Sequence, residues 1–277
     1  MKKVGLLICL FILLLAGCTK QPDYNNRLVV SIPPQKWLLE EIVGDKFDID
    51  IVFDKGTDAE TSEPTMQQMA GLSQAKIFFT VGTLASEQAL TKRIISSNPE
   101  LKITDTGAQV VLISGTHGAN PDPHIWTSPA NLVRMAREML TAVCEIDPDN
   151  EKLYADRFFR LKGKIESFSD RTSRRLSYRP DAAFAIWHPT LTYFARDFGI
   201  EQISMETEGK EATPKQVVNR IADASDKKVK VVVADTGADI TKESALAGQL
   251  GVPIIKINPL AEDILGELNK VADALMQ

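Results

Sequence analysis

The chain has 277 residues, of which 44% are hydrophobic and 25% are charged. A chain of this length and composition forms one large α/β domain or two lobes with cores of their own, which excludes an intrinsically disordered protein. Its formal net charge is −5, or −5 − 2 = −7 without Lys2 and Lys3. Such an acidic chain lacks the basic surface of nucleic-acid-binding proteins, so no nucleic-acid partner is expected.

Residues 1–17 are predicted to be a lipoprotein signal peptide. Two lysines precede an apolar stretch from Val4 to Leu15, which is shorter than the roughly 20 residues of a membrane-spanning helix. The sequence Leu15-Ala16-Gly17-Cys18 resembles the lipoprotein box of bacteria, in which the cysteine carries the lipid. We therefore expect cleavage before Cys18, a lipid-anchored tether over residues 18–27, and a location outside the cytoplasm, facing the periplasm or on the cell surface.

Strands and helices are predicted to alternate along the first half of the chain. Strands are expected at residues 28–32, 47–53, 76–81 and 109–113, and helices at residues 37–43, from 66 onward, at 83–95 and at 129–143. Residues 148–178 are charged, with apolar residues at helical spacing, which predicts a helix about 45 Å long. That helix is expected to be a rigid spine between two halves; a long surface helix is the alternative.

The second half repeats the alternation. Strands are expected at residues 182–187, 200–205, 229–233 and 253–257, and helices at 190–197, 213–226, 240–250 and 262–276. Alternating strands and helices imply parallel sheets covered on both faces. The predicted fold is therefore α/β, with an N-terminal lobe (28–146) and a C-terminal lobe (180–277). One long spine helix (147–179) joins them, and a cleft lies between them.

Two of the three histidines stand in similar surroundings. His124 lies in Asp122-Pro123-His124-Ile125-Trp126, and His188 lies in Ile186-Trp187-His188-Pro189, at the end of an apolar run. Each is flanked by tryptophan and proline at the end of an apolar segment, which suggests two halves of one site. His124 is expected in a loop outside the cores, and Trp126 and Trp187 are expected to line the site. The third histidine, His117, is expected to be exposed to solvent.

Three further polar residues follow predicted strands: Glu60, Asp235 and Asn258. In open parallel sheets, ligands bind beyond the carboxyl ends of the strands, so these side chains are expected in one cleft with the two histidines. Two imidazoles and two carboxylates suit zinc, and also manganese or iron. Each residue has a structural alternative: Glu60 lies in an acidic loop, Asp235 could cap a helix and Asn258 fits a turn.

At these residues the chain resembles the metal-binding lipoproteins and periplasmic proteins that supply zinc or manganese to ABC importers. Asp122-Pro123-His124-Ile125-Trp126 matches their specific Asp-Pro-His-Ile/Val-Trp motif, and the resemblance covers nearly the whole chain after the leader. The remaining similar segments are Trp187 to Phe194, Gly56 to Thr65, Val233-Ala234-Asp235 and Ile257-Asn258-Pro259-Leu260. The resemblance implies a two-lobed protein that binds one metal ion between its lobes.

The chain departs from that family at two positions. Glu60 stands where the family's first loop has a histidine, and Asn258 stands where the family has a late aspartate. The loop before Asp122, which is long and rich in histidine in many zinc-binding members, is short here and holds only His117. These departures affect the choice of metal rather than the fold.

The resemblance implies an extracytoplasmic lipoprotein that captures zinc, or in second place manganese, and delivers it to an ABC transporter permease. No chemistry is required, because coordination, closure of the lobes and release at the permease suffice. The expected protein is a monomer and not an enzyme. Two alternatives remain: a zinc-dependent hydrolase built on the same ligands, and a degenerate family member that serves in adhesion or binds another ligand.

Overall fold

The computed structural model of the chain describes residues 26–54, 59–114, 120–206, 212–237 and 239–277. The signal peptide, Cys18 and His117 therefore lie outside the described residues. Within them, eight strands form two parallel sheets. The N-terminal lobe holds β1 (Arg27–Val30), β2 (Asp48–Ile51), β3 (Ile77–Thr80) and β4 (Lys102–Asp105), in the order β2-β1-β3-β4. The C-terminal lobe holds β5 (Ala183–Ile186), β6 (Glu201–Ser204), β7 (Val232–Asp235) and β8 (Ile254–Ile257), in the order β6-β5-β7-β8.

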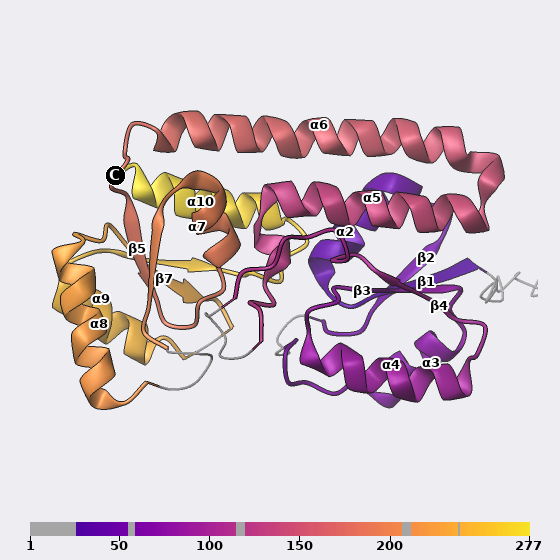
Figure 1. Ribbon diagram of the computed structural model, residues 1–277, viewed down its shortest axis with the longest axis horizontal. Helices are drawn as coiled ribbons and strands as arrows, with labels where there is room; N and C mark the ends of the chain where they lie inside the picture. The colour runs from indigo at the N-terminus through magenta and orange to yellow at the C-terminus, as the bar shows by residue number, and fades with distance from the viewer. Residues whose placement is uncertain (1–25, 55–58, 115–119, 207–211, 238) are drawn as a thin grey trace, which may run out of the picture.

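Helices cover both faces of each sheet (Figure 1). In the N-terminal lobe, α2 (Pro33–Val43) and α5 (Pro129–Ile146) cover one face, and α3 (Met66–Ser73) and α4 (Ala85–Ser97) cover the other. In the C-terminal lobe the corresponding pairs are α7 (Thr192–Phe198) with α10 (Ile264–Leu275), and α8 (Pro214–Asp226) with α9 (Thr241–Leu250). Short 3-10 turns lie at Ile125–Thr127 (η3) and Pro148–Asn150 (η4). No described helix has both the length and the apolar content to cross a bilayer.

The helix starts follow from local sequence. The Ser128 side chain accepts a hydrogen bond from the Asn131 backbone N–H at 3.0 Å, and Pro129 occupies the first helical position of α5. This pairing satisfies a free N–H group and presets the backbone angle. Thr65 and Thr213 cap α3 and α8 in the same way, each with a glutamine three residues later. The helix starts predicted at these three positions are confirmed.

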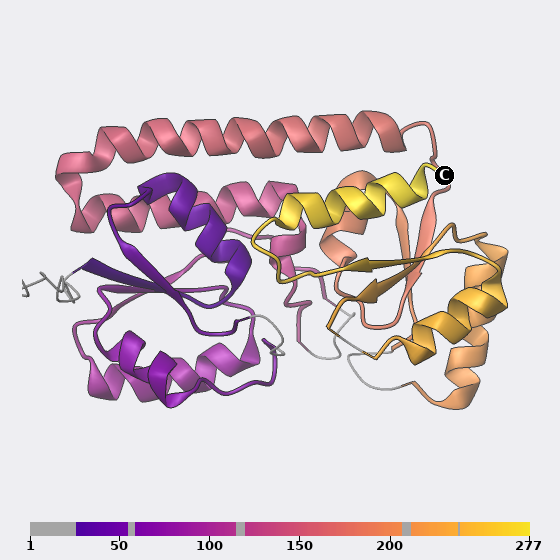
Figure 2. The same ribbon diagram turned by 180° about the vertical axis from the view of Figure 1, so that it is seen from behind.

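The long helix α6 (Glu151–Leu176) lies along both lobes (Figures 1 and 2). Its 26 residues correspond to about 39 Å. One face is buried, and Arg157 near its start donates a hydrogen bond of 2.6 Å to the Val43 carbonyl at the end of α2. Near its other end, Arg175 donates to Asn269 of α10 at 3.2 Å. The prediction of two α/β halves joined by one long helix is therefore confirmed.

One hydrophobic core runs through both lobes beneath α6. It includes Phe78 and Phe79 of β3, Phe158 of α6, and Phe184 of β5. A second, smaller cluster lies on the opposite face of the C-terminal sheet. Because the larger core is continuous, the two lobes pack against each other as well as against α6.

The strand predicted at residues 109–113 is wrong. The fourth strand of the N-terminal sheet is Lys102–Asp105, at the edge, where a strand needs to bury only part of its surface. Val111 is 75% exposed, and the segment extends toward the other lobe: the Ile113 backbone N–H donates to the Tyr193 hydroxyl at 3.2 Å. Its apolar composition therefore reflects not a strand but the partial burial of Val110 and Ile113 against the main core.

Candidate metal centre

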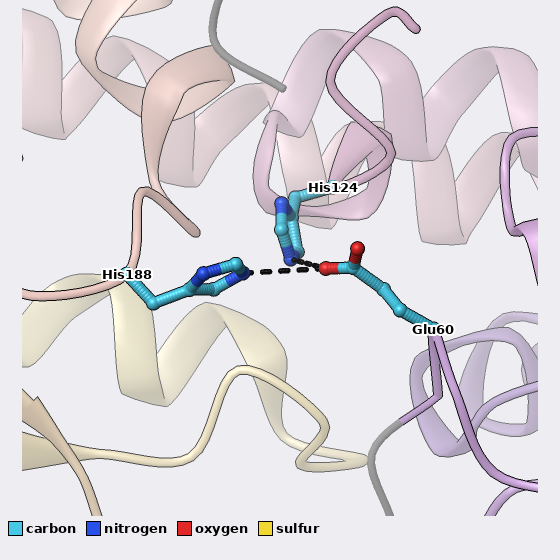
Figure 3. Close-up of side chains that lie close together, drawn as sticks. All are labelled: Glu60, His124 and His188. Carbon is cyan, nitrogen blue, oxygen red and sulfur yellow. Dashed lines mark hydrogen bonds and ion pairs between the residues drawn. The ribbon is translucent and has the colours of Figure 1, made fainter. Parts of the chain in front are cut away.

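Three predicted ligands come together between the lobes: Glu60, His124 and His188 (Figure 3). Nε2 of His124 and Nε2 of His188 each lie 3.2 Å from Oε1 of Glu60. One potential ligand atom from each residue lies within 4.8 Å of the others. Within the described residues, no other group of three or more His, Cys, Asp or Glu side chains meets this criterion.

The three side chains arrive from different elements. Glu60 lies in the loop between β2 and α3, His124 lies directly before η3, and His188 lies two residues after β5. The cavity they line has a volume of about 400 Å³ and is bounded by residues of both lobes. Since parallel strands direct their carboxyl ends to the same edge, both sheets present their polar loops to this cavity.

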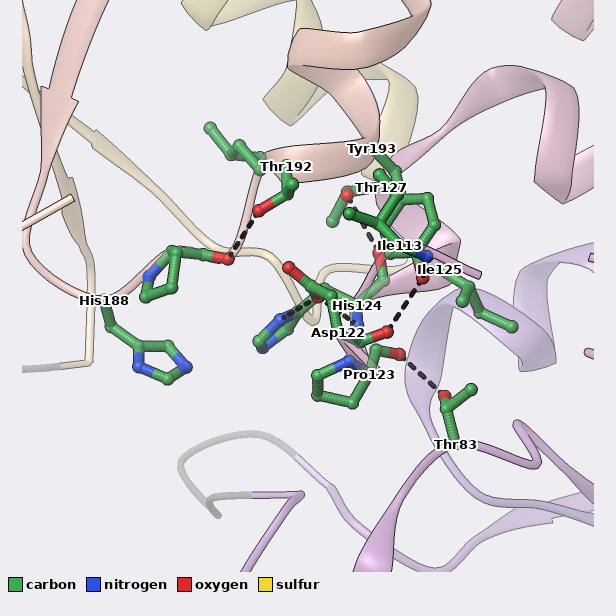
Figure 4. Close-up of polar contacts among 12 residues, drawn as sticks. Thr83, Ile113, Asp122, Pro123, His124, Ile125, Thr127, His188, Thr192 and Tyr193 are labelled. Atoms are coloured by element: carbon green, nitrogen blue, oxygen red, sulfur yellow. Dashed lines mark hydrogen bonds and ion pairs between the residues drawn. The ribbon is translucent and has the colours of Figure 1, made fainter. Parts of the chain in front are cut away.

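A buried carboxylate orients His124. The ring Nδ1 and the backbone N–H of His124 each lie 2.9 Å from Oδ1 of Asp122, which is fully buried. The Tyr193 hydroxyl of the C-terminal lobe donates to the Asp122 carbonyl at 2.9 Å (Figure 4). His124 lies in a loop, as expected, but it is only 4% exposed, because it is enclosed between the lobes beside the cavity. Its Nδ1–H is directed at Asp122, which leaves Nε2 directed at the cavity.

A second carboxylate orients His188. Nδ1 of His188 lies 2.7 Å from Oε2 of Glu206, which also lines the cavity. Each imidazole therefore has a carboxylate behind Nδ1 and directs Nε2 forward, as is usual for metal-binding histidines. Glu206 was not predicted. The register could have revealed it, because Ile186 of β5 pairs with Ser204 of β6, and His188 and Glu206 each follow two residues later.

The charges of the cluster depend on one another. Burial raises the pKa of Glu60, but hydrogen bonds from His124 and His188 outweigh it and hold that pKa well below its usual range. Burial lowers the pKa of His188, but Glu206 and Glu60 outweigh it and raise the pKa to about 10. The pKa of His124 is likewise raised, because Asp122 and Glu60 outweigh its burial. Two Nε2 atoms that face one carboxylate oxygen require protons or a cation between them, so the donor set fits a metal ion.

The other predicted residues lie at or beyond the edge of this cluster. Asp235 lines the cavity, is exposed, and accepts a hydrogen bond from the Gly237 N–H at 2.9 Å. Asn258 is not among the lining residues, and its side-chain oxygen accepts from the Leu260 N–H at 2.9 Å, which is a turn contact.

The two tryptophans differ in their relation to the cavity. Trp126 lines it as expected, and its indole N–H donates to the Pro259 carbonyl of the other lobe at 2.9 Å. Trp187 does not line it; instead, it packs against the smaller core of the C-terminal lobe, beneath Lys242. The expectation for Trp187 is wrong.

Known proteins resemble this chain over almost its whole length. A putative metal-binding protein of Chlamydia trachomatis is 27% identical, with 96% of this chain and 98% of the relative aligned. The metal ABC transporter substrate-binding lipoprotein SloC of Streptococcus mutans is 23% identical. The alignment spans 92% of this chain and 88% of SloC. The zinc-binding lipoprotein AdcA of Streptococcus pneumoniae is 22% identical. The alignment spans 94% of this chain but only 56% of AdcA.

Solved structures and a family model agree with these relatives. The crystal structure of ZnuA superposes with a TM-score of 0.84 at 29% identity, covering 91% of this chain and 98% of that chain. A ZnuA deletion mutant with zinc bound gives a TM-score of 0.85 at 29% identity over 91% of this chain and 96% of its own. The family model described as zinc-uptake complex component A, periplasmic, matches residues 28–274. The chain therefore belongs to the ZnuA family of zinc-uptake components.

Proposed function

We propose that this chain captures one zinc ion outside the cytoplasm, with manganese as the second candidate, and delivers it to the permease of an ABC importer. Members of its family are metal-binding substrate-binding proteins of ABC transporters. The observation that carries the proposal is the convergence of His124 and His188 on Glu60, each Nε2 3.2 Å from the same oxygen. These three side chains are the proposed ligands of the transported ion.

The donor set supports zinc before manganese. Two imidazole nitrogens suit zinc, whereas a carboxylate in place of a third imidazole is a harder donor that favours manganese. The similar AdcA is a zinc-binding lipoprotein, and the similar ZnuA deletion mutant was solved with zinc. Asp235, which lines the same cavity, is the proposed fourth donor. Asn258 is not included in the proposed set, because its side chain is used in a turn.

Transport needs no chemical step, so the residues have only to bind and release the ion. The hydrolase alternative is set aside, because the family consists of substrate-binding proteins rather than enzymes. The proposed organisation has an N-terminal lobe at 28–146, a spine at 147–179 and a C-terminal lobe at 180–277. The ion would bind between the lobes, within reach of a permease that contacts both.

The membrane anchor is part of the proposal. The box Leu15-Ala16-Gly17-Cys18 supports lipidation of Cys18 and a short tether to residue 27, which would hold the protein, proposed to be a monomer, at the membrane surface. The relatives SloC and AdcA are both lipoproteins by name. In cells that express the full chain, Cys18→Ala should release soluble protein or leave an uncut precursor. Unchanged membrane retention would argue against a lipid anchor.

Calorimetric titration of residues 19–277, purified without a His tag, tests the binding proposal. Zinc and manganese should each bind to one site, with zinc the tighter. A degenerate member that serves in adhesion would give no binding heat with either ion, confirmed by metal analysis after dialysis. That result would refute metal capture.

A further inference from the structure

Two hydroxyl groups at the start of α4 bond to the residues that directly precede two of the proposed ligands. The Thr83 hydroxyl donates to the Pro123 carbonyl at 2.8 Å, and Pro123 precedes His124 (Figure 4). The Ser86 hydroxyl donates to the Ala59 carbonyl at 2.6 Å, and Ala59 precedes Glu60. One short stretch of chain therefore contacts both ligand loops of the N-terminal lobe.

This stretch is itself firmly held. Glu87, which is 2% exposed, accepts hydrogen bonds from the backbone N–H groups of Val81 at 2.6 Å and Gly82 at 2.8 Å. It also accepts one from the hydroxyl of Ser31, which follows β1. Residues 81–87 are thus tied to the ends of β1 and β3, the two central strands of the sheet.

The turn before α4 also depends on a glycine. Gly82 has φ of +87°, and an added Cβ would lie 2.0 Å from a carboxylate oxygen of Asp105. Only glycine fits that backbone conformation and that close approach. The conformation that presents Thr83 and Ser86 is therefore strongly specified.

The two hydroxyl groups are not used to begin the helix. The residue that caps α4 is Leu84, which makes no side-chain capping bond. Thr83 lies before it and Ser86 lies in the first turn, and both direct their bonds away from α4 to other loops. A purely local role in helix initiation does not explain these contacts.

We propose that Thr83 and Ser86 are positioning residues that set the separation of His124 from Glu60 and thereby the metal affinity of the site. This inference rests on the proposed function, because it assumes that both side chains bind the ion. Metal–ligand distances tolerate only a few tenths of an ångström, so a loop that relaxes weakens binding. Loss of groups that orient ligands typically lowers metal affinity about 10- to 100-fold.

Zinc titration of variants of residues 19–277 tests the proposal. Ser86→Ala and Thr83→Val should each weaken zinc binding about tenfold, whereas Ser86→Thr and Thr83→Ser, which keep the hydroxyl, should restore it. Matched controls are Ser96→Ala on α4 and Thr141→Val on α5, whose exposed hydroxyls bond only within their own helices. Both controls should bind zinc like the parent.

A double-mutant cycle separates positioning from general destabilisation. In a Glu60→Ala background, Ser86→Ala should cause no further loss of zinc affinity, because it acts through Glu60. Thr83→Val should still weaken binding there, because it acts through His124. Equal losses for Ser86→Ala with and without Glu60, or parent-like affinity in both single variants, would overturn the inference. Failure of the parent to bind zinc or manganese would instead refute the proposed function.

Discussion

The carboxylate behind His188 gives the sharpest prediction about how the site works. Glu206 lies 2.7 Å from Nδ1 of His188 and is not among the three clustered ligands. Glu206→Ala removes both the acceptor that orients the ring and the negative charge that strengthens Nε2 as a donor. We expect zinc affinity to fall 10- to 100-fold, or about 1.4–2.7 kcal/mol of binding free energy. Glu206→Gln keeps an oxygen that can accept the Nδ1–H bond, so its loss should be the smaller of the two.

Competition titration with a chelator of known zinc affinity provides the measurement. Glu201→Gln is the matched control, because it removes the same charge from an exposed position of the C-terminal lobe, where Glu201 pairs with Lys227 at 3.0 Å. That control should bind zinc like the parent. If Glu206→Ala binds zinc within twofold of the parent, the carboxylate does not orient His188 in the bound state and the reasoning fails.

The remaining predictions concern the metal preference, the protons and the fold. Glu60→His should raise zinc affinity relative to manganese affinity, because it adds an imidazole ligand. Glu60→Gln should weaken the binding of both metals, because it removes a negative charge. Unchanged zinc and manganese dissociation constants in both variants would remove Glu60 from the site. Zinc binding at pH 7 should release close to one proton from His188, whose pKa is raised to about 10 because Glu206 and Glu60 outweigh its burial. A further release is expected from His124, whose pKa is raised because Asp122 and Glu60 outweigh its burial. Calorimetry in buffers of different ionisation enthalpy counts the protons, and release of none would contradict this. Burial raises the pKa of Glu87 from 4.5 to about 7, so the free energy of unfolding of the metal-free protein is highest below pH 4.5 with respect to this group. The free energy of unfolding should fall by up to about 3 kcal/mol as the pH rises through 7 and the Glu87 carboxyl loses its proton. Urea unfolding at pH 5 and pH 8 should show a larger fall in the parent than in Glu87→Gln, in which only the contribution of this carboxyl is removed.

The central strands and the edge strand β2 of the N-terminal sheet could be predicted from the sequence, whereas the other edge strand, β4, could not. Phe78 and Phe79 lie in a strand that is buried on both faces, so it appears as a continuous apolar run. The edge strand Lys102–Asp105 has a single apolar residue, Ile103, among three polar ones and is only partly buried, so its signal is weak. The apolar run at 109–113 predicts a strand instead, and only the tertiary structure shows that this segment leads toward Tyr193.

The candidate site was partly predictable for a similar reason. His124 and His188 stood out because a histidine between proline and an aromatic residue, at the end of an apolar run, is unusual in sequence. Glu206 did not stand out, because carboxylates are common in polar loops and only the pairing of β5 with β6 places it beside His188. Asn258 followed a strand as Asp235 did, but the turn that follows it uses its side chain.

The central proposal is that one metal ion is bound by side chains from both lobes. Crystals of residues 19–277 grown with zinc, measured at the zinc absorption edge, test this most directly. We expect one strong anomalous peak between the lobes, about 2.0–2.2 Å from Nε2 of His124, Nε2 of His188 and a carboxylate oxygen of Glu60. A zinc-loaded crystal with no peak there, or with its peak bound by neither histidine, would contradict it.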